Sequence, residues 1–333
     1  MEANLVQRAG YRFTGIPSAG LHGVGIKALP GNILRLFKGL QAARRIIKEF
    51  HPDGLLLTGG YVSIPVAIAG RKTPNLLFVP DIEPGLAIKL VSRFASKIAV
   101  TTADSLRFFN QKSKVIVTGY PTRSELIERE QIEVRKKFNL TQDKRVVMVL
   151  GGSQGAQSMN RALYPQLPEL LKRFQIIHLY GEQNREENQA ESNKLPGEES
   201  SSYHPYPFLH AEDLSAAFSA SDLVVSRAGA AVLGEFPLFG LPAILVPYPY
   251  AWRYQQVNAD YLENHGAAIV LQDADMRSSL TNILFDLFDH PERLLKMANA
   301  MNSLSNPSAA QYIARQIEEI VQESAMTPKG RLI

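Results

Sequence analysis

The sequence contains no cysteine, so the chain can form neither a disulfide nor a thiolate metal site, and it gives no support for secretion. It also lacks the run of about 18 apolar residues that a membrane-spanning helix needs. Residues 1–13 have no apolar core of the signal-peptide type. The net charge of +4 suits an anionic lipid surface or a phosphate-bearing ligand. Because no known nucleic-acid-binding module accompanies that charge, we expect no nucleic-acid partner.

Short apolar runs alternate with helical patterns along the 333 residues. Apolar strands separated by amphipathic helices predict parallel sheets covered on both faces, which is the α/β class. The predicted strands are 54–58, 75–79, 97–101, 114–118, 145–150, 175–180, 222–226, 243–247 and 267–271. Helices are predicted at 33–50, 158–173, 211–220 and 256–265.

The chain is too long for one typical core, so we expect two domains. We predict a first domain at 1–124 and a second domain at 143–305, joined by a charge-rich linker at 125–142 that includes a helix. A C-terminal helix and tail at 306–333 could pack back on the first domain. The polar stretch 182–204, inside the second domain, is predicted to be an exposed loop or a frayed helix.

Three glycine-containing turns follow predicted strands: Gly59–Gly60, Gly151–Gly152 and the small residues of 226–235. Glycine permits a tight turn and close approach of a ligand, and the backbone N–H groups of a helix start attract anions. The alternative interpretation of each turn is an ordinary strand-to-helix connection. Three such turns at the carboxyl edge of parallel strands favour a phosphate-bearing ligand. None has the GxGxxG pattern with an acidic residue about 20 positions on, so a nicotinamide-dependent dehydrogenase is excluded.

Polar side chains that suit a sugar nucleotide lie close to these turns. Glu235 could accept hydrogen bonds from two ribose hydroxyls, or it could be a solvated helix residue. Gln255, Gln256 and Asn258 can donate and accept, as sugar hydroxyls require, or they could be exposed amides of a helix start. Trp252, the chain's only tryptophan, could stack on a sugar or simply pack.

Four segments become specific in combination: "GGYVS", "GGSQGA", "SRAGAAVLGE" and "GLPAILVPYPYAWRYQQVNA". With "GIPSAGLHGVGIKAL" and "VTGYPTR", this ordered set resembles the bacterial glycosyltransferases of family 28 that add N-acetylglucosamine to undecaprenyl-diphospho-muramoyl-pentapeptide in peptidoglycan synthesis. The resemblance runs from residue 1 to about residue 305. It implies the GT-B architecture, two Rossmann-like domains with the active site in the cleft between them. It also implies an inverting hexosyltransferase with no cofactor and no metal.

The resemblance implies that the second domain binds UDP-N-acetylglucosamine. The donor-binding residues that it implies are Arg123, Gly152, Ser153, Gln154, Gly155, Leu209, Ala230, Ala231, Val232, Leu233, Gly234, Glu235, Gln255 and Gln256. Within that set, Ser153 would contact the diphosphate, Glu235 the ribose and the two glutamines the sugar. The acceptor-binding residues would be Gly59, Gly60 and Tyr61 in the first domain.

The lipid-linked acceptor stays in the bilayer, so the resemblance also implies a peripheral protein on the cytoplasmic face of the cell membrane. The helical stretch 33–50 carries an apolar stripe flanked by basic residues. Ile33, Leu34 and Phe37 at its start are the predicted contacts with an anionic membrane surface. For most of the stripe we expect a core-facing helix instead.

The sequence departs from the family at two places. The family begins with a strand and a turn "GGTGGH" before a segment like "MEANLV", with which this chain opens, so the family histidine is absent and the catalytic residue stays unknown. In "FVPDIEPG", where the family has "HEQN", we expect Asp81 and Glu83 to be surface-loop carboxylates. His22, in a glycine-rich loop, is a weak candidate for the base.

Two explanations of the different start remain open. The gene start could be assigned to an internal Met of a working enzyme, which we expect. In that case the 333-residue chain would transfer little, and an added upstream strand, turn and histidine would restore activity. Alternatively, the chain could bind a UDP-sugar without full catalysis. A related lipid-directed glycosyltransferase, such as a diacylglycerol galactosyltransferase, is a further alternative.

Overall fold

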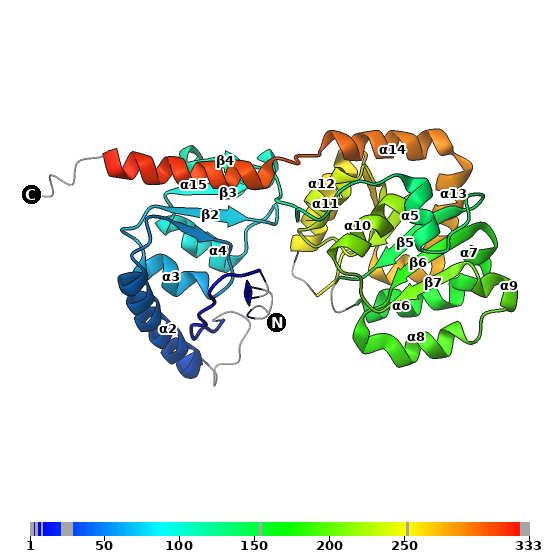
Figure 1. The fold of residues 1–333 in the computed structure, drawn as a ribbon, viewed down its shortest axis with the longest axis horizontal. Coiled ribbons are helices and arrows are strands. Elements are labelled where there is room, and N and C mark those ends of the chain that lie inside the picture. The colour runs from blue at the N-terminus through cyan, green and yellow to red at the C-terminus, as the bar shows by residue number, and fades with distance from the viewer. Residues whose placement is uncertain are drawn as a thin grey trace, which may run out of the picture. The chain divides into compact units, whose positions relative to one another are not determined.

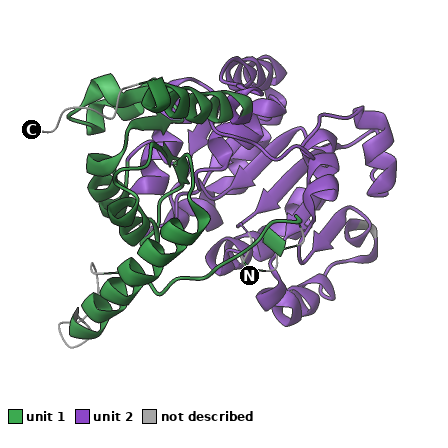
Figure 2. Ribbon diagram, turned by 60° about the vertical axis from the view of Figure 1, so that its left-hand side comes forward, with its two compact units in different colours: residues 1–80, 84–118, 311–333 green, residues 81–83, 119–310 purple. Residues whose placement is uncertain are grey.

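The computed structural model describes residues 3, 6–7, 9–20, 29–152, 155–250 and 253–326. The chain forms two compact units, shown in different colours in Figure 2. Unit 1 consists of residues 1–80, 84–118 and 311–333, and unit 2 consists of residues 81–83 and 119–310.

Unit 1 contains a four-stranded parallel sheet with the strand order β1-β2-β3-β4. Its strands are β1 (Leu55–Leu57), β2 (Asn75–Val79), β3 (Lys97–Val100) and β4 (Val115–Val117). Its helices are α2 (Leu29–Phe50), α3 (Ser63–Ala69), α4 (Leu86–Val91) and most of α15 (Ala309–Met326), with short 3-10 turns η2 (Ser92–Phe94), η3 (Ala103–Phe108) and η4 (Lys112–Lys114). Figure 1 shows α2, α3 and α4 on one side of these strands and α15 on the other. All five residues of β2 are buried, as a continuous apolar strand covered on both faces requires.

Polar contacts join α15 to β3. The Lys97 ammonium lies 3.3 Å from Gln316 Oε1, which is on α15. It also lies 3.7 Å from Glu319 and 3.9 Å from Glu323. Residues 311–333 therefore belong to the unit that contains the first part of the chain.

Helix α2 buries one face and exposes another. Gly39 and Ala43 are buried, whereas Ile33, Leu34 and Phe37 are each 54% exposed. The apolar stripe thus faces inward along the middle of the helix, and its first turns leave large apolar side chains in contact with solvent. No helix in the described part of the chain combines the length and the apolar character that crossing a membrane requires.

Unit 2 contains a six-stranded parallel sheet with the strand order β10-β9-β8-β5-β6-β7. Its strands are β5 (Arg145–Leu150), β6 (Phe174–Leu179), β7 (Tyr203–Tyr206), β8 (Leu223–Ser226), β9 (Ala243–Leu245) and β10 (Ala268–Val270). Its helices are α5 (Gln131–Lys137), α6 (Gln157–Leu163), α7 (Leu167–Arg173), α8 (Arg185–Ser192), α9 (Gly197–Ser200), α10 (Ala211–Ala220), α11 (Val232–Leu238), α12 (Tyr254–Asn264), α13 (Met276–Asp289) and α14 (Pro291–Ser303). Short 3-10 turns are η5 (Tyr164–Gln166), η6 (Glu182–Asn184) and η7 (Asp273–Asp275). The two parallel sheets confirm the predicted α/β class and the two Rossmann-like domains.

The stretch 182–204, predicted to be an exposed loop or a frayed helix, contains the helical segments η6, α8 and α9, and it also contains the start of strand β7, which was not predicted. Tyr203, the first residue of β7, is 7% exposed, and its hydroxyl oxygen lies 2.7 Å from His178 Nδ1 on β6. Strand β7 is at the edge of the sheet, where Pro205 costs no ladder hydrogen bond. Because this stretch is polar, its composition did not predict β7, whose first residue, Tyr203, is buried.

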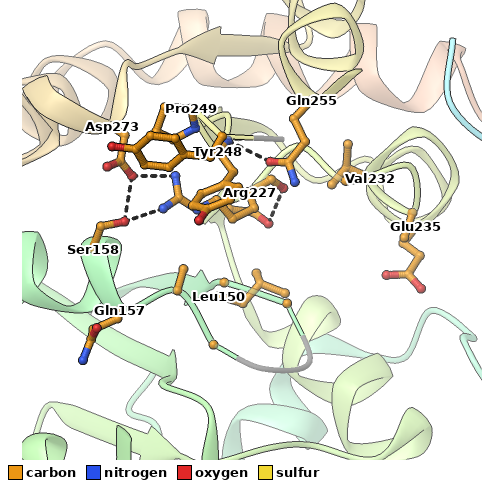
Figure 3. A pocket seen from close by; sticks show the side chains of 18 of the residues that line it. Leu150, Gln157, Ser158, Arg227, Val232, Glu235, Tyr248, Pro249, Gln255 and Asp273 are labelled. Atoms are coloured by element: carbon orange, nitrogen blue, oxygen red, sulfur yellow. Dashed lines mark hydrogen bonds and ion pairs between the residues drawn. The ribbon is translucent and has the colours of Figure 1, made fainter. Parts of the chain in front are cut away.

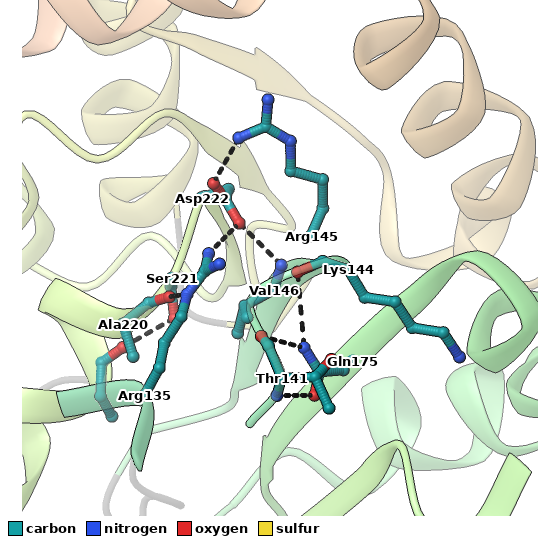
Figure 4. Close-up of polar contacts among 10 residues, drawn as sticks. Arg135, Thr141, Lys144, Arg145, Val146, Gln175, Ala220, Ser221 and Asp222 are labelled. Atoms are coloured by element: carbon teal, nitrogen blue, oxygen red, sulfur yellow. Dashed lines mark hydrogen bonds and ion pairs between the residues drawn. The ribbon is translucent and has the colours of Figure 1, made fainter. Parts of the chain in front are cut away.

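The predicted linker at 125–142 is packed into unit 2 as α5 and its flanking turns. Arg135, 4% exposed, donates to Asp222 Oδ2 at 2.7 Å and to the carbonyl of Ala220 at 3.1 Å (Figure 4). Asp222 also accepts from the guanidinium of Arg145 at 3.0 Å and from the N–H of Val146 at 2.7 Å. The helix predicted in this stretch is confirmed as α5, and one of its charged residues, Arg135, is buried against a carboxylate.

Candidate functional site

The turns after β5, β8 and β9 of unit 2 surround a pocket of about 770 Å³ (Figure 3). These three strands are neighbours in the sheet, so their carboxyl ends meet at one edge. The lining residues are Leu150, Gly151, Gly152, Gly155, Ala156, Gln157, Ser158, Ser226, Arg227, Gly229, Ala231, Val232, Glu235, Phe236, Tyr248, Pro249, Tyr250, Gln255 and Asp273.

The turn between β5 and α6 depends on glycine. Gly152 and Gly155 have φ angles of +87° and +74°, in the left-handed region. The N–H of Gly155 donates to the carbonyl of Gly152 at 2.9 Å, which closes the turn. A Cβ on Gly155 would lie 2.3 Å from the carbonyl oxygen of Tyr180, so no other residue fits without movement. Ser153 and Gln154, at the tip of this turn, lie outside the described residues.

A buried hydrogen-bond network lies behind this turn. The amide of Asn160 on α6 donates to the carbonyl of Tyr180 at 2.9 Å, so its Oδ1 faces His178 Nε2 at 3.0 Å. Complete burial lowers the pKa of His178 to about 3, so the imidazole is neutral. The neutral ring donates through Nε2 to Asn160, and its Nδ1 lies 2.7 Å from the hydroxyl oxygen of Tyr203, which itself donates to Asn188 Oδ1 at 2.7 Å. The network therefore fixes the start of α6 against β6.

Arg227 directly follows β8. It contacts residues in the segments that follow β5, β9 and β10 at the carboxyl edge of the sheet. It is 7% exposed, donates to Ser158 Oγ at 2.5 Å and to the carbonyl of Val246 at 3.1 Å, and lies 2.6 Å from Asp273 Oδ1. Its guanidinium also lies 5.3 Å from the ring centre of Tyr248. Figure 3 shows Ser158 and Asp273 pointing toward it. Because these partners occupy it, Arg227 shapes the pocket instead of presenting a free cation to a ligand.

The carboxylate of Glu235, on α11, lies on another side of the pocket. Glu235 Oε1 accepts a hydrogen bond of 3.0 Å from Arg123 Nη2. Burial raises the pKa of Glu235, and the charge and hydrogen bond of Arg123 oppose that shift. The side chain of Tyr120 packs against Gly234, where a Cβ would approach its ring to 2.7 Å.

The two neighbouring glutamines of α12 differ in direction. Gln255 lines the pocket, and its Oε1 accepts from the N–H of Tyr248 at 2.9 Å, which leaves its amide hydrogens available for a ligand. Gln256 instead donates to Asp260 Oδ1 at 2.7 Å, and its side chain is not part of the lining.

Asn258 and Arg253 hold the short segment 81–83 within unit 2. The fully buried amide of Asn258 donates to Asp81 Oδ1 at 2.9 Å and accepts from the N–H of Ile82 at 3.1 Å. Glu83 is 3% exposed and forms a two-point ion pair with Arg253, at 2.5 and 2.7 Å. The prediction that Asp81 and Glu83 are surface-loop carboxylates is therefore wrong, and Asn258 has a structural partner in place of a sugar.

Comparisons with known proteins identify the relatives of this chain. The model of the glycosyltransferase family 28 C-terminal domain matches residues 146–313, and that of the family 28 N-terminal domain matches residues 1–100. The chain belongs to glycosyltransferase family 28. A Roseiflexus sp. (strain RS-1) relative is 37% identical over 96% of this chain and 82% of its own length, and one from Desulforamulus reducens is 34% identical over 96% and 88%. Both are named UDP-N-acetylglucosamine–N-acetylmuramyl-(pentapeptide) pyrophosphoryl-undecaprenol N-acetylglucosamine transferase.

A solved structure supports the same assignment to family 28. The crystal structure of Acinetobacter baumannii MurG is 26% identical, with a TM-score of 0.71, and the match covers 96% of this chain and 88% of that one. The predicted GT-B fold and the resemblance to family 28 are thus confirmed.

For this family 28 chain, six of the predicted donor residues line the pocket: Gly152, Gly155, Ala231, Val232, Glu235 and Gln255. Arg123 reaches the pocket through Glu235. The remaining described residues of the prediction, Leu209, Ala230, Leu233, Gly234 and Gln256, are not part of the lining. Gly234 allows the close approach of Tyr120, a neighbour within the protein, and Leu209 and Leu233 are buried. Trp252 and His22 lie outside the described residues.

Sequence reasoning missed Arg227, Asp273 and Ser158, although all three line the pocket of the family 28 chain. Arg227 had one usable signal, because it stands directly between a buried strand and a turn of small residues. Asp273 had none, since its partner lies far away in the sequence and only the fold brings the two together.

The predicted acceptor residues of the family 28 chain follow β1 in unit 1. Gly59 and Gly60 have φ angles of +94° and +73°, so the backbone there makes a turn that favours glycine. Tyr61 is 42% exposed and lies in the turn before α3, which begins at Ser63, whose hydroxyl donates to the carbonyl of Gly59. The turn is therefore formed at the carboxyl edge of the sheet, as the sequence predicted.

Proposed function

We propose that this family 28 enzyme transfers N-acetylglucosamine from UDP-N-acetylglucosamine to undecaprenyl-diphospho-N-acetylmuramoyl-pentapeptide. The observation that carries the proposal is the pocket of unit 2, in which a glycine turn, a buried carboxylate and a pocket-facing amide meet at one sheet edge. Its volume of about 770 Å³ is in the range of small-molecule sites. The printed names of the curated relatives agree with this reaction.

Each part of the donor has a partner of suitable chemistry in this pocket. The diphosphate suits the turn after β5, where glycines at positive φ let a ligand approach the backbone N–H groups. The ribose hydroxyls suit Glu235, an acceptor that lines the pocket. The sugar hydroxyls suit the amide hydrogens of Gln255, whose oxygen is already held by Tyr248.

The reaction exchanges one bond at the anomeric carbon of the sugar. A hydroxyl of the acceptor attacks that carbon, the bond from the carbon to the UDP oxygen breaks, and UDP leaves with the electron pair. A base takes the proton of the attacking hydroxyl. Among the described residues, no side chain makes a contact that supports a role as this base, so the base is not assigned. The residues of the pocket orient the sugar nucleotide. They also supply hydrogen-bond donors and acceptors for its charged and polar groups.

We expect Glu235→Ala to weaken UDP binding by about 1–3 kcal/mol, which is about 5- to 150-fold in the dissociation constant. The physical reason is the loss of a buried acceptor for the ribose hydroxyls. Titration calorimetry with UDP measures this change. Equal UDP affinity in the wild-type protein and the variant would remove the ribose assignment.

The transfer itself is tested with UDP-N-acetylglucosamine and the lipid-linked acceptor. We expect transfer above the rate of the Glu235→Ala variant. UDP binding with no transfer at all would favour a sugar-nucleotide-binding homologue, and transfer of galactose to diacylglycerol would favour the other lipid-directed activity. A wild-type protein that does not bind UDP would contradict all three.

A second prediction concerns the two glutamines of α12, whose side chains have different partners. We expect Gln255→Ala to reduce the preference for UDP-N-acetylglucosamine over its galacto epimer by about three- to tenfold, the worth of one hydrogen bond. Gln256→Ala should leave the preference unchanged, because its amide is turned to Asp260. Calorimetry with both nucleotides checks the pair, and an effect of Gln256→Ala as large as that of Gln255→Ala would show that α12 is placed differently.

Membrane contact is proposed for the first turns of α2, with the protein bound at the cytoplasmic face of the membrane. Ile33, Leu34 and Phe37 are half exposed there, and Arg35 and Lys38 beside them are exposed cations. An apolar cluster with flanking cations suits an anionic leaflet, where each cation contributes about 1 kcal/mol. The acceptor turn at Gly59 and Gly60 is in the same unit.

We expect the protein to sediment with vesicles that contain anionic lipid, more at low salt than at high salt. Leu34→Glu should reduce the bound fraction and leave the fold intact, since the side chain is 54% exposed. Leu295→Glu, at a 62% exposed position on α14, is the matched control and should bind like the wild type. An absence of binding at low salt would refute the membrane contact.

A further inference from the structure

The Arg123–Glu235 pair uses only half of the carboxylate. Arg123 Nη2 donates to Glu235 Oε1 at 3.0 Å. Within the described part of the chain, no other side chain forms a hydrogen bond or an ion pair with that carboxylate, so Oε2 keeps its capacity to accept. The Glu235 side chain is 13% exposed and lines the pocket, whereas that of Arg123 is 49% exposed.

We propose that Arg123 is a positioning residue for the ribose of the donor: it holds Glu235 ionised and oriented through Oε1, so that Oε2 accepts a ribose hydroxyl. In this role Arg123 acts through Glu235 and does not contact the diphosphate. The inference rests on the proposed function, because it specifies how the same pocket recognises the nucleoside.

The groups around Glu235 explain why a cation is needed. Burial raises the pKa of Glu235, and Arg123 is the group that lowers it. The other titratable groups on this side are Tyr120, whose pKa is raised first by burial and then by Glu235 and Asp81, and Asp81 itself, whose pKa is also raised by burial. Neither carries a positive charge. Arg227, the cation elsewhere in the pocket lining, is committed to Asp273.

Removal of the cation should therefore give UDP binding a new dependence on pH. In Arg123→Gln the pKa of Glu235 rises further, so the ionised fraction of its carboxyl falls as the pH falls. The protonated form has lost the charge that strengthens its hydrogen bonds to hydroxyls. The loss of UDP affinity in Arg123→Gln is therefore larger at acidic pH and becomes smaller as the pH rises. In the wild type the charge and the hydrogen bond of Arg123 lower the pKa of Glu235 and so favour its ionised form.

The test compares UDP with 2′-deoxy-UDP by calorimetry at pH 8 and pH 6. The ratio of the two affinities isolates the ribose hydroxyl, because both ligands carry the same titrating diphosphate. We expect the ratio of the wild type to change less between the two pH values than that of Arg123→Gln. In Arg123→Gln the ratio should be smaller than in the wild type and should fall from pH 8 to pH 6, whereas Arg123→Lys, which keeps the charge, should stay close to the wild type. Arg173→Gln removes an equal charge from an ion pair with Asp289, outside the pocket lining, and is the matched control.

A second arm keeps the inference testable if Arg123→Gln is less stable. Glu235→Ala removes the side chain through which Arg123 is proposed to act, so an added Arg123→Gln should have no further effect on the UDP ratio in that background. A further loss in the double variant would overturn the inference. An equal loss of affinity for both ligands at both pH values would also overturn it, because it would show a direct contact of Arg123 with the phosphates, and the proposed transferase function would stand. A wild-type protein that fails to bind UDP would overturn both.

Discussion

Replacing Asp222 by alanine should lower the free energy of unfolding of unit 2 by about 3–5 kcal/mol, the cost of leaving a buried charge without its partner. The charge is that of Arg135, which is 4% exposed and has its Nη2 2.7 Å from Asp222 Oδ2. The same substitution frees the N–H of Val146 at the start of β5. The loss therefore falls on the central part of the sheet and on the packing of α5 together.

Denaturant unfolding followed by circular dichroism measures this loss. Asp213→Ala is the matched control. Asp213 pairs with Lys137, which is on α5 like Arg135, but the side chains of Asp213 and Lys137 are 41% and 47% exposed. It should cost about 0–1 kcal/mol. If Asp222→Ala and Asp213→Ala cost the same, the buried pair does not hold α5.

Replacing Gly155 by alanine should have the largest effect in the pocket. A non-glycine residue in the left-handed region costs about 1–2 kcal/mol, and the new methyl group would lie 2.3 Å from the carbonyl of Tyr180. Overpacking of that kind adds about 1–3 kcal/mol. If the turn gives way, the proposed diphosphate site is lost with it, and we expect UDP affinity to fall by at least about 100-fold, which is about 2.7 kcal/mol.

Substitutions of Gly152 and Gly197 serve as comparisons for Gly155→Ala. Gly152→Ala carries the backbone cost alone, because its φ is +87° but no atom lies within 4 Å of the new Cβ. Gly197→Ala on α9 meets neither a positive φ nor a neighbour and should behave like the wild type. Calorimetry with UDP and thermal unfolding of all three variants should rank Gly155 above Gly152 and Gly152 above Gly197. A Gly155→Ala protein that binds UDP normally would show that the turn is not part of the site.

The sequence predicted most of the sheet because burial on both faces leaves a strong pattern. Strand β2, for example, is buried along its whole length, and every residue after its first, Asn75, is apolar. Strand β7 escaped because it is an edge strand of four residues that contains a proline. A helix was predicted in the segment that contains α5, but its packing was not, because Arg135 is buried against a residue that lies 87 positions away.

The site was predictable where backbone geometry alone restricts the residue type. Gly152 and Gly155 could be found because a tight turn after a strand restricts the choice to glycine. The role of Arg227 could not be found, because its partner Asp273 becomes a neighbour only after folding. Gln255 and Gln256 looked equivalent in the sequence, and the competing partner Asp260, one helical turn on, is what separates them.

The three residues 81–83 bear on any exchange of parts between members of this family. They stand in the middle of the sequence of unit 1, yet they belong to unit 2, where the backbone and carboxylate of this segment satisfy the buried amide of Asn258. A chimera that swapped residues 119–310 as one block would separate that amide from the segment that satisfies it. The unit that can be transplanted is therefore discontinuous, and its smallest piece is a tripeptide encoded between β2 and α4.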